Sequence, residues 1–270
     1  MNLIKNPTYL DSFAIIKADL IKYTPQLVFS KTRNREIPPK ADSSSILITV
    51  QNRFFLITTG HTLHNRSLQT IGIMLENIFY SLSGKSAYHE PNIDFEYEPN
   101  KLDMGVVELD EYAVSILKRK YEFLQIEQMD FYHFNSKQFQ YLIYGYPVEK
   151  TSKDINTKII SPYPISLFTI EETIENYLLN NIDIKRVIML KGEQNRLLHL
   201  ETKLEKTKPL PLFEGLSGCG VWRVEGLMSI KPEYKLVSMI TGSTETQDIL
   251  YSTKVTAILG ILKMNFGLDI

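Results

Sequence analysis

The spacing of apolar residues along the chain follows a helical period near its start. Phe13, Ile16 and Leu20 recur at intervals of three and four positions, with polar residues between them. This spacing predicts a short helix over residues 10–23 that buries one face. Residues 1–35 are expected to form an N-terminal extension.

The period changes at residue 46. β-Branched and aromatic residues fill segments 46–50 and 54–59, on either side of a polar turn at 51–53. This pattern predicts a β-hairpin. Before it, two prolines at 38–39 and three serines at 43–45 are expected to interrupt regular structure.

Short apolar segments bounded by turn residues continue through the rest of the chain. Strands are predicted at 70–75, 104–109, 139–144, 165–170, 186–190, 197–202, 220–224, 235–240 and 249–252. Helical spacing returns at 111–123 and at 254–264, where Ser252 or Thr253 is available as N-cap. Many short strands with few helices favour an all-β sandwich or barrel.

The chain is expected to divide into two β halves. The boundary is predicted within 124–138, after the helix at 111–123. The first half then spans residues 36–135. The second spans 136–270 and includes the C-terminal helix.

Composition and charge narrow the class of protein. The chain has 43% hydrophobic and 23% charged residues, which is ordinary for a globular domain. Thirty basic residues against 31 acidic ones give a net charge of −1, which argues against nucleic acid or anionic membrane as partner. A single cysteine, Cys219, excludes an intramolecular disulfide and a cysteine-based metal cluster. Without a secretory h-region or a long apolar run, a cytoplasmic location is expected.

The segment 214–222 carries the most informative chemistry. Glycines at 215, 218 and 220 surround Ser217, directly before an apolar strand. Such a loop can present the Ser217 hydroxyl, while the N–H groups of Gly215 and Ser217 converge as an oxyanion hole. Taken alone, the same loop is equally a glycine-rich hairpin turn with an idle serine.

Two further residues are candidate catalytic partners of Ser217. His61 follows an apolar strand at a glycine turn, and Asp103 precedes another apolar strand. Each alone is more often structural. Together they supply the base that a serine nucleophile needs and the carboxylate that orients the base.

With these three segments the sequence resembles the trypsin-like (chymotrypsin-fold) serine proteases. Ile57-Thr-Thr-Gly-His61 resembles the histidine motif, Leu102-Asp103-Met-Gly the aspartate strand, and Gly215-Leu-Ser217-Gly the nucleophile loop. The resemblance implies a double β-barrel with a C-terminal helix. It also implies peptide-bond cleavage by a His61–Asp103–Ser217 triad, with no cofactor and no metal.

Departures from the family pattern refine this expectation. Leu216 stands where extracellular members carry the Asp that pairs with a newly cut N-terminus, so activation by clipping is not expected and the bacterial intracellular, HtrA-like branch is more similar. Pro211 stands where trypsin has its specificity aspartate, so cleavage after basic residues is not implied. By the same resemblance, Thr241, Gly242 and Ser243 line the substrate pocket.

Other readings fit less well. The α/β-hydrolase order needs a histidine after the serine, and the last histidine here is His199. The subtilisin order needs an aspartate before His61 in a βαβ setting, which the pattern does not show. Cys219 is most simply a small buried residue.

A protease-like fold that binds other molecules without cleaving them remains the alternative function. A cytoplasmic protease is expected to be narrowly specific for a protein or peptide substrate, or latent until a partner activates it in a defence or stress system.

Overall fold

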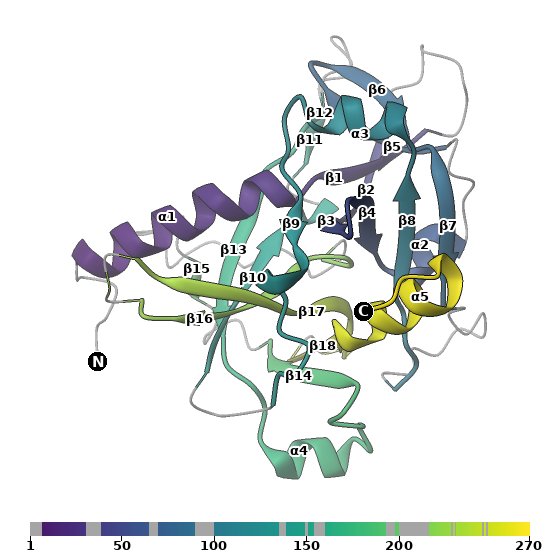
Figure 1. Cartoon of the computed structure of the whole chain (residues 1–270). Helices are drawn as coiled ribbons and strands as arrows, with labels where there is room; N and C mark the ends of the chain where they lie inside the picture. Colours follow the sequence, from purple (N-terminus) through teal and green to yellow (C-terminus); the bar gives the residue numbers. More distant parts are fainter. Residues whose placement is uncertain are drawn as a thin grey trace.

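The computed structural model describes residues 7–30, 39–64, 70–89, 100–134, 139–148, 151–153, 160–192, 198–199, 216–227, 229, 231–244, 246 and 248–270 (Figure 1). The helices are α1 (Pro7–Tyr23), α2 (Gly60–His64), α3 (Glu111–Leu117), α4 (Ile174–Leu179), α5 (Thr256–Phe266) and the 3₁₀ helix η2 (Ile126–Gln128). The strands of the first half are β1 (Gln26–Phe29), β2 (Lys40–Ser44), β3 (Ile46–Val50), β4 (Arg53–Thr58), β5 (Ile71–Leu75), β6 (Ile78–Ser81), β7 (Gly84–Tyr88), β8 (Gly105–Leu109) and β9 (Leu124–Gln125). Those of the second half are β10 (Gln140–Gly145), β11 (Ser152–Lys153), β12 (Ile160–Ser161), β13 (Ile165–Thr169), β14 (Val187–Lys191), β15 (Leu198–His199), β16 (Gly220–Glu225), β17 (Glu233–Ser243) and β18 (Ile249–Lys254). None of the described helices combines the length and the apolar character needed to cross a bilayer.

The first half is built from two sheets around one apolar interior. One sheet has the order β2-β1-β5-β6 and the other β7-β8-β4-β3-β9. The chain passes from β2 to β3 across Ser45 and thereby joins the two sheets. Leu27, Leu56 and Val107 are among the residues buried between them. We call this half the first barrel.

The second half closes on itself. Its seven-stranded sheet has the order β14-β18-β17-β16-β10-β13-β15. Beyond β13, the N–H of Glu172 donates to the Met189 carbonyl at 2.9 Å and the N–H of Lys191 donates to Ile170 at 3.0 Å, which links β13 back to β14. Ile143, Val221 and other residues fill the interior. We call this half the second barrel.

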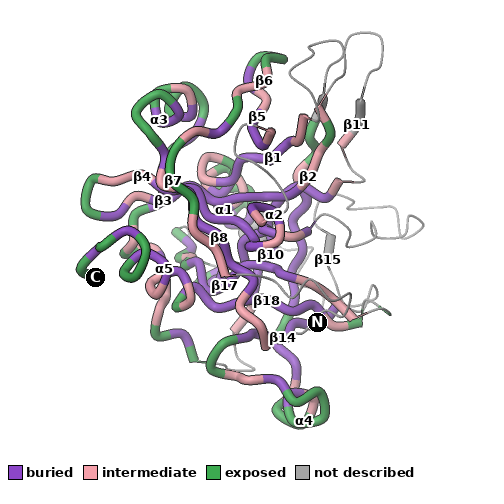
Figure 2. Tube along the Cα trace, turned by 90° about the vertical axis from the view of Figure 1, so that its right-hand side faces the viewer, coloured by how far each residue is buried: buried purple, intermediate pink, exposed green. Residues whose placement is uncertain are grey.

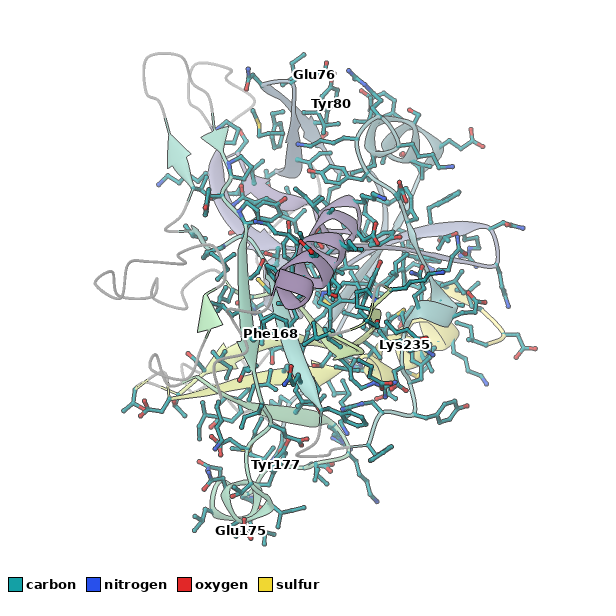
Figure 3. All side chains as sticks on the ribbon, turned by 90° about the vertical axis from the view of Figure 1, so that its left-hand side faces the viewer. Glu76, Tyr80, Phe168, Glu175, Tyr177 and Lys235 are labelled. Carbon is teal, nitrogen blue, oxygen red and sulfur yellow. The ribbon has the colours of Figure 1, made fainter. Side chains whose placement is uncertain are left out.

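A third apolar core lies between the barrels and includes both long helices. Phe13, Ile16 and Leu20 of α1 are buried in it, as the helical spacing predicted. Figure 2 shows this buried interior, with α4 largely exposed at the periphery and α3 buried on one face only. Phe168 of β13 lies beside α1, its ring centroid 5.6 Å from that of Phe13 (Figure 3).

The predicted hairpin and the N-terminal helix are confirmed, whereas three local predictions are wrong. The helix expected over 111–123 ends at Leu117; a turn over 118–120 follows, and Tyr121 and Phe123 are buried in the first-barrel core from the non-helical chain that leads to β9. The serines at 43–45 do not interrupt the chain, since Ser43 and Ser44 belong to β2.

The start of the C-terminal helix also differs from the prediction. Ser252 and Thr253 are not N-caps because their hydroxyls are used inside the second barrel. Ser252 accepts from Ser238 Oγ at 2.9 Å, and Thr253 Oγ1 lies 3.5 Å from Thr241 Oγ1. The strand therefore continues to Lys254, and the N-cap position falls on Val255.

A buried polar cluster surrounds the hydroxyl of Tyr141, whose side chain is part of the second-barrel interior. His133 Nε2 is 3.0 Å from the Tyr141 hydroxyl, and its Nδ1 is 3.6 Å from Asp130 Oδ2. Burial lowers the pKa of His133 to about 4, and the positive charges of Lys254 and Arg223 act in the same direction while Asp130 opposes them. The histidine is therefore neutral in the folded protein at neutral pH.

Candidate active site

His61 and Asp103 are brought together by two neighbouring strands of the first barrel. β4 and β8 run antiparallel, with Thr58 paired to Gly105. The C-terminal end of β4 therefore lies beside the N-terminal end of β8. His61 follows β4 in α2, and Asp103 directly precedes β8, so both side chains emerge at the same edge of the sheet.

The contact between them uses both carboxylate oxygens. His61 Nδ1 lies 2.6 Å from Asp103 Oδ2, and the backbone N–H of His61 donates to Asp103 Oδ1 at 2.8 Å. The Asp103 side chain is 9% exposed, whereas that of His61 is 40% exposed. A buried carboxylate thus fixes an imidazole that still reaches solvent.

This geometry sets the tautomer of His61. A carboxylate only accepts hydrogen bonds, so Nδ1 must carry the hydrogen and Nε2 keeps its lone pair. Thr59 Oγ1 lies 3.4 Å from Nε2. An imidazole with Nε2 unprotonated is the form that removes a proton from a serine hydroxyl.

Gly60 is required by the closeness of this arrangement. A Cβ at this position would lie 2.5 Å from the carbonyl oxygen of His89 and 3.0 Å from Asp103 Oδ1. A larger residue would push the carboxylate away from His61. The glycine of the histidine motif is therefore explained by the approach of the aspartate.

Ser217 lies in a tight turn just before β16. Gly218 has φ of +81°, a conformation that favours glycine. The N–H of Gly218 donates to the Ile240 carbonyl of β17 at 2.9 Å, and the Ser217 carbonyl accepts from the N–H of Ser44 at 2.9 Å. The turn is therefore tied to the second barrel on one side and to the first barrel on the other.

The same contacts place the Ser217 turn at the end of β4, from which His61 follows. Thr58 Oγ1 donates to the Ser44 carbonyl at 2.9 Å. A Cβ on Gly218 would overlap that carbonyl and would lie 3.0 Å from Thr58 Oγ1. The arrangement brings a serine turn from one barrel against the strand that leads to the histidine of the other.

The predicted substrate-pocket residues fall in different places. Thr241, Gly242 and Ser243 form the end of β17, directly after Ile240, which binds Gly218. They pair with β18 across a register shift between Ile240 and Gly242. Gly215 and Pro211 lie outside the described residues.

Cys219 is buried in the second barrel, as the sequence predicted. Burial raises the pKa of its thiol to about 12. A thiol of this kind stays protonated at neutral pH, and the thiolate is the nucleophilic form of cysteine. Ser217 is the better candidate nucleophile of the two.

The contribution of Ser44 is the part of the site that the sequence interpretation missed. A run of serines usually interrupts regular secondary structure, which is why the sequence predicts an interruption at 43–45. The available signal was its position immediately before the strongly apolar strand at 46–50. Ser44 is fully buried, and both of its backbone polar groups contact the site segments described above.

No family model and no curated protein matches the sequence. Among solved structures, the VesB protease of Vibrio cholerae matches with a TM-score of 0.51 and 10% sequence identity, over 91% of this chain and 64% of its own. The inactivated protease paralogue S-D1 of the scabies mite matches with a TM-score of 0.52 and 12% identity, over 93% of this chain and 96% of its own. The chain therefore has the chymotrypsin-like double β-barrel fold of the trypsin-like serine proteases, with an N-terminal and a C-terminal helix, as the resemblance implied.

Proposed function

We propose that this chain is a serine endopeptidase that cleaves peptide bonds through an acyl-enzyme. One observation carries the proposal: the His61–Asp103 pair lies beside β4, and the Ser217 turn is bonded to Ser44, whose carbonyl accepts the hydroxyl of Thr58 at the end of the same strand. These are the three groups that acyl transfer requires, supplied by both barrels of a fold that supports this chemistry.

In the proposed mechanism Ser217 Oγ attacks the scissile carbonyl carbon while His61 Nε2 takes the hydroxyl proton. Asp103 stabilises the imidazolium that forms. The N–H groups of Gly215 and Ser217 hold the oxyanion. His61 then returns the proton to the leaving amine, and the C–N bond breaks. Water, deprotonated by His61, attacks the acyl-enzyme, and the ester C–O bond breaks to release the acid. His61 then returns the proton to Ser217 Oγ, which restores the hydroxyl.

The proposed substrate is a protein or peptide, and we propose that activity depends on a partner protein. The support is Leu216, which is buried in the second-barrel interior. A buried leucine forms no ion pair with a newly cut N-terminal amine, so the clipping that activates extracellular relatives has no counterpart here. A cytoplasmic defence or stress system is the proposed setting.

The test is intact mass after exposure to a fluorophosphonate probe, followed by peptide mapping. We expect one adduct, located on Ser217, that is absent from Ser217→Ala. Ser115→Ala is the matched control, because Ser115 is an exposed residue of α3 and its hydroxyl donates to the nearby Tyr112 carbonyl at 2.7 Å. An adduct that persists in Ser217→Ala would refute the assignment.

The competing function is a protease-like fold that binds without cleaving. The fold alone does not choose between the two, since one of the similar structures is an inactivated protease paralogue. The fluorophosphonate experiment does choose. An adduct that appears only after a partner is added supports the latent enzyme, whereas no adduct under either condition supports the binding module.

A further inference from the structure

Ser44 joins the two segments that meet at the candidate active site. Its N–H donates to the Ser217 carbonyl at 2.9 Å, and its own carbonyl accepts the Thr58 hydroxyl at 2.9 Å. One residue of the first barrel therefore contacts both the serine turn and the strand that leads to His61.

The side chain of Ser44 adds two contacts on the second barrel. Its Oγ accepts from the N–H of Tyr146, at the end of β10, at 2.8 Å, and lies 3.2 Å from Cys219 Sγ. Cys219 follows Ser217 by one intervening glycine. The Ser44 hydroxyl thus contacts the turn at Cys219, and the Ser44 backbone N–H binds the same turn at the Ser217 carbonyl.

We propose that Ser44 is a positioning residue that holds the Ser217 turn in register with His61, an inference that rests on the proposed function. The fully buried hydroxyl accepts from the Tyr146 N–H, which also bonds the Cys219 thiol. Without the hydroxyl, the Tyr146 N–H keeps only the weaker sulfur acceptor, and the contact between Ser44 Oγ and Cys219 is lost. The Ser217 turn then keeps the backbone bond to Ser44 but loses the side-chain contacts that fix its distance from the first barrel.

A shift of this kind should reduce reaction at Ser217 strongly, since a misplacement of about 1 Å can cost on the order of 10²-fold. We expect Ser44→Ala to lower the second-order rate of fluorophosphonate labelling by at least about tenfold. The pH midpoint of labelling should stay unchanged, because the Ser44 hydroxyl contacts Cys219 and Tyr146 of the second barrel, whereas His61 and Asp103 lie at the ends of β4 and β8 in the first.

Ser45→Ala is the matched control. Ser45 is also fully buried, and its hydroxyl donates to the Pro25 carbonyl at 3.0 Å, away from the serine turn. Both variants lose one buried hydroxyl, so a purely structural effect would be similar in the two. Equal labelling rates in Ser44→Ala and Ser45→Ala would overturn the proposal, and so would a shift in the pH midpoint without a lower plateau.

A second measurement works even if the protein is not a protease. Cys219 is the single cysteine, so its rate of reaction with a thiol reagent under native conditions reports opening of the serine turn. We expect faster reaction in Ser44→Ala than in Ser45→Ala. If the wild type takes up no fluorophosphonate even with partners, the proposed function fails, and the thiol rates alone decide the role of Ser44.

Thr58→Val provides a second variant in case Ser44→Ala does not fold. It keeps the side-chain shape and removes the hydroxyl that donates to the Ser44 carbonyl. Slower labelling and faster Cys219 reaction than in Ser45→Ala are expected again. Wild-type values for both rates would overturn the proposal.

Discussion

Replacing Asp103 with asparagine keeps the shape of the side chain and changes what it offers to His61. The backbone N–H of His61 needs an acceptor, so the amide oxygen takes the place of Oδ1 and the amide NH₂ faces Nδ1. Nδ1 must then accept a hydrogen bond, which moves the imidazole hydrogen to Nε2. In that tautomer His61 has no lone pair directed at the proton of a serine.

The size of the effect follows from the distance between the two groups. At 2.6 Å and an effective dielectric constant of about 20, an imidazolium and a carboxylate attract by about 6 kcal/mol. The His61 side chain is 40% exposed, and solvent screening reduces this attraction to about 4–5 kcal/mol. At about 1.4 kcal/mol for each factor of ten, the expected loss is roughly 10³- to 10⁴-fold.

The assay is the second-order rate of fluorophosphonate labelling of Asp103→Asn, measured where the wild type labels. Asp110→Asn is the control, since Asp110 also accepts a backbone N–H, from Ala113 at the start of α3, but lies away from His61. Unfolding by urea checks that both variants are folded. A folded Asp103→Asn that labels within about threefold of the wild type would refute the role assigned to the carboxylate.

Two further predictions concern stability: one compares glycine substitutions at the site and away from it, and the other concerns the pH dependence that His133 contributes. Gly218→Ala forces a side chain into positive φ and against the Ser44 carbonyl, so it should cost roughly 2–5 kcal/mol of unfolding free energy and abolish labelling. Gly267→Ala has a similar φ of +66° but open space around its Cβ, and should cost only about 1–2 kcal/mol; equal losses would contradict the packing argument. The pKa of His133 falls from 6.5 to about 4 on folding, so the unfolded chain binds the extra proton as the pH drops through this window, and stability falls by about 2 kcal/mol at pH 5. His133→Gln should remove this part of the loss of stability in urea unfolding at pH 7.5 and 5, and an unchanged pH dependence would argue against it.

The features that the sequence predicted correctly are those that depend on local pattern. The hairpin of β3 and β4 combines β-branched residues with a polar turn, where Gln51 and Asn52 both adopt positive φ. The buried face of α1 follows from helical spacing. The proximity of His61 and Asp103 came from the family resemblance, because their segments are far apart in the chain.

The features that the sequence did not predict depend on distant partners. Ser44 is extended and buried because residues more than a hundred positions away satisfy its polar groups, which no local window contains. Helix α4 was missed since Ile174, Leu178 and Leu179 are all exposed, so its apolar residues mark no buried face. Its one local signal was Thr173, which caps the helix.

Each long helix contacts the half of the molecule that is farther from it along the chain. α1 precedes both barrels yet contacts the second, where Ser12 Oγ donates to the Ser229 carbonyl at 2.7 Å. α5 follows both barrels yet covers the first, where Arg53 donates to the Phe266 carbonyl at 2.8 Å. During synthesis, the first barrel must therefore leave the ribosome with an apolar surface that remains uncovered until α5 is made. Contacts of such long range slow folding and favour completion of both barrels together. A chain that ended before α5 would therefore carry His61 and Asp103 on a barrel whose apolar surface is still uncovered.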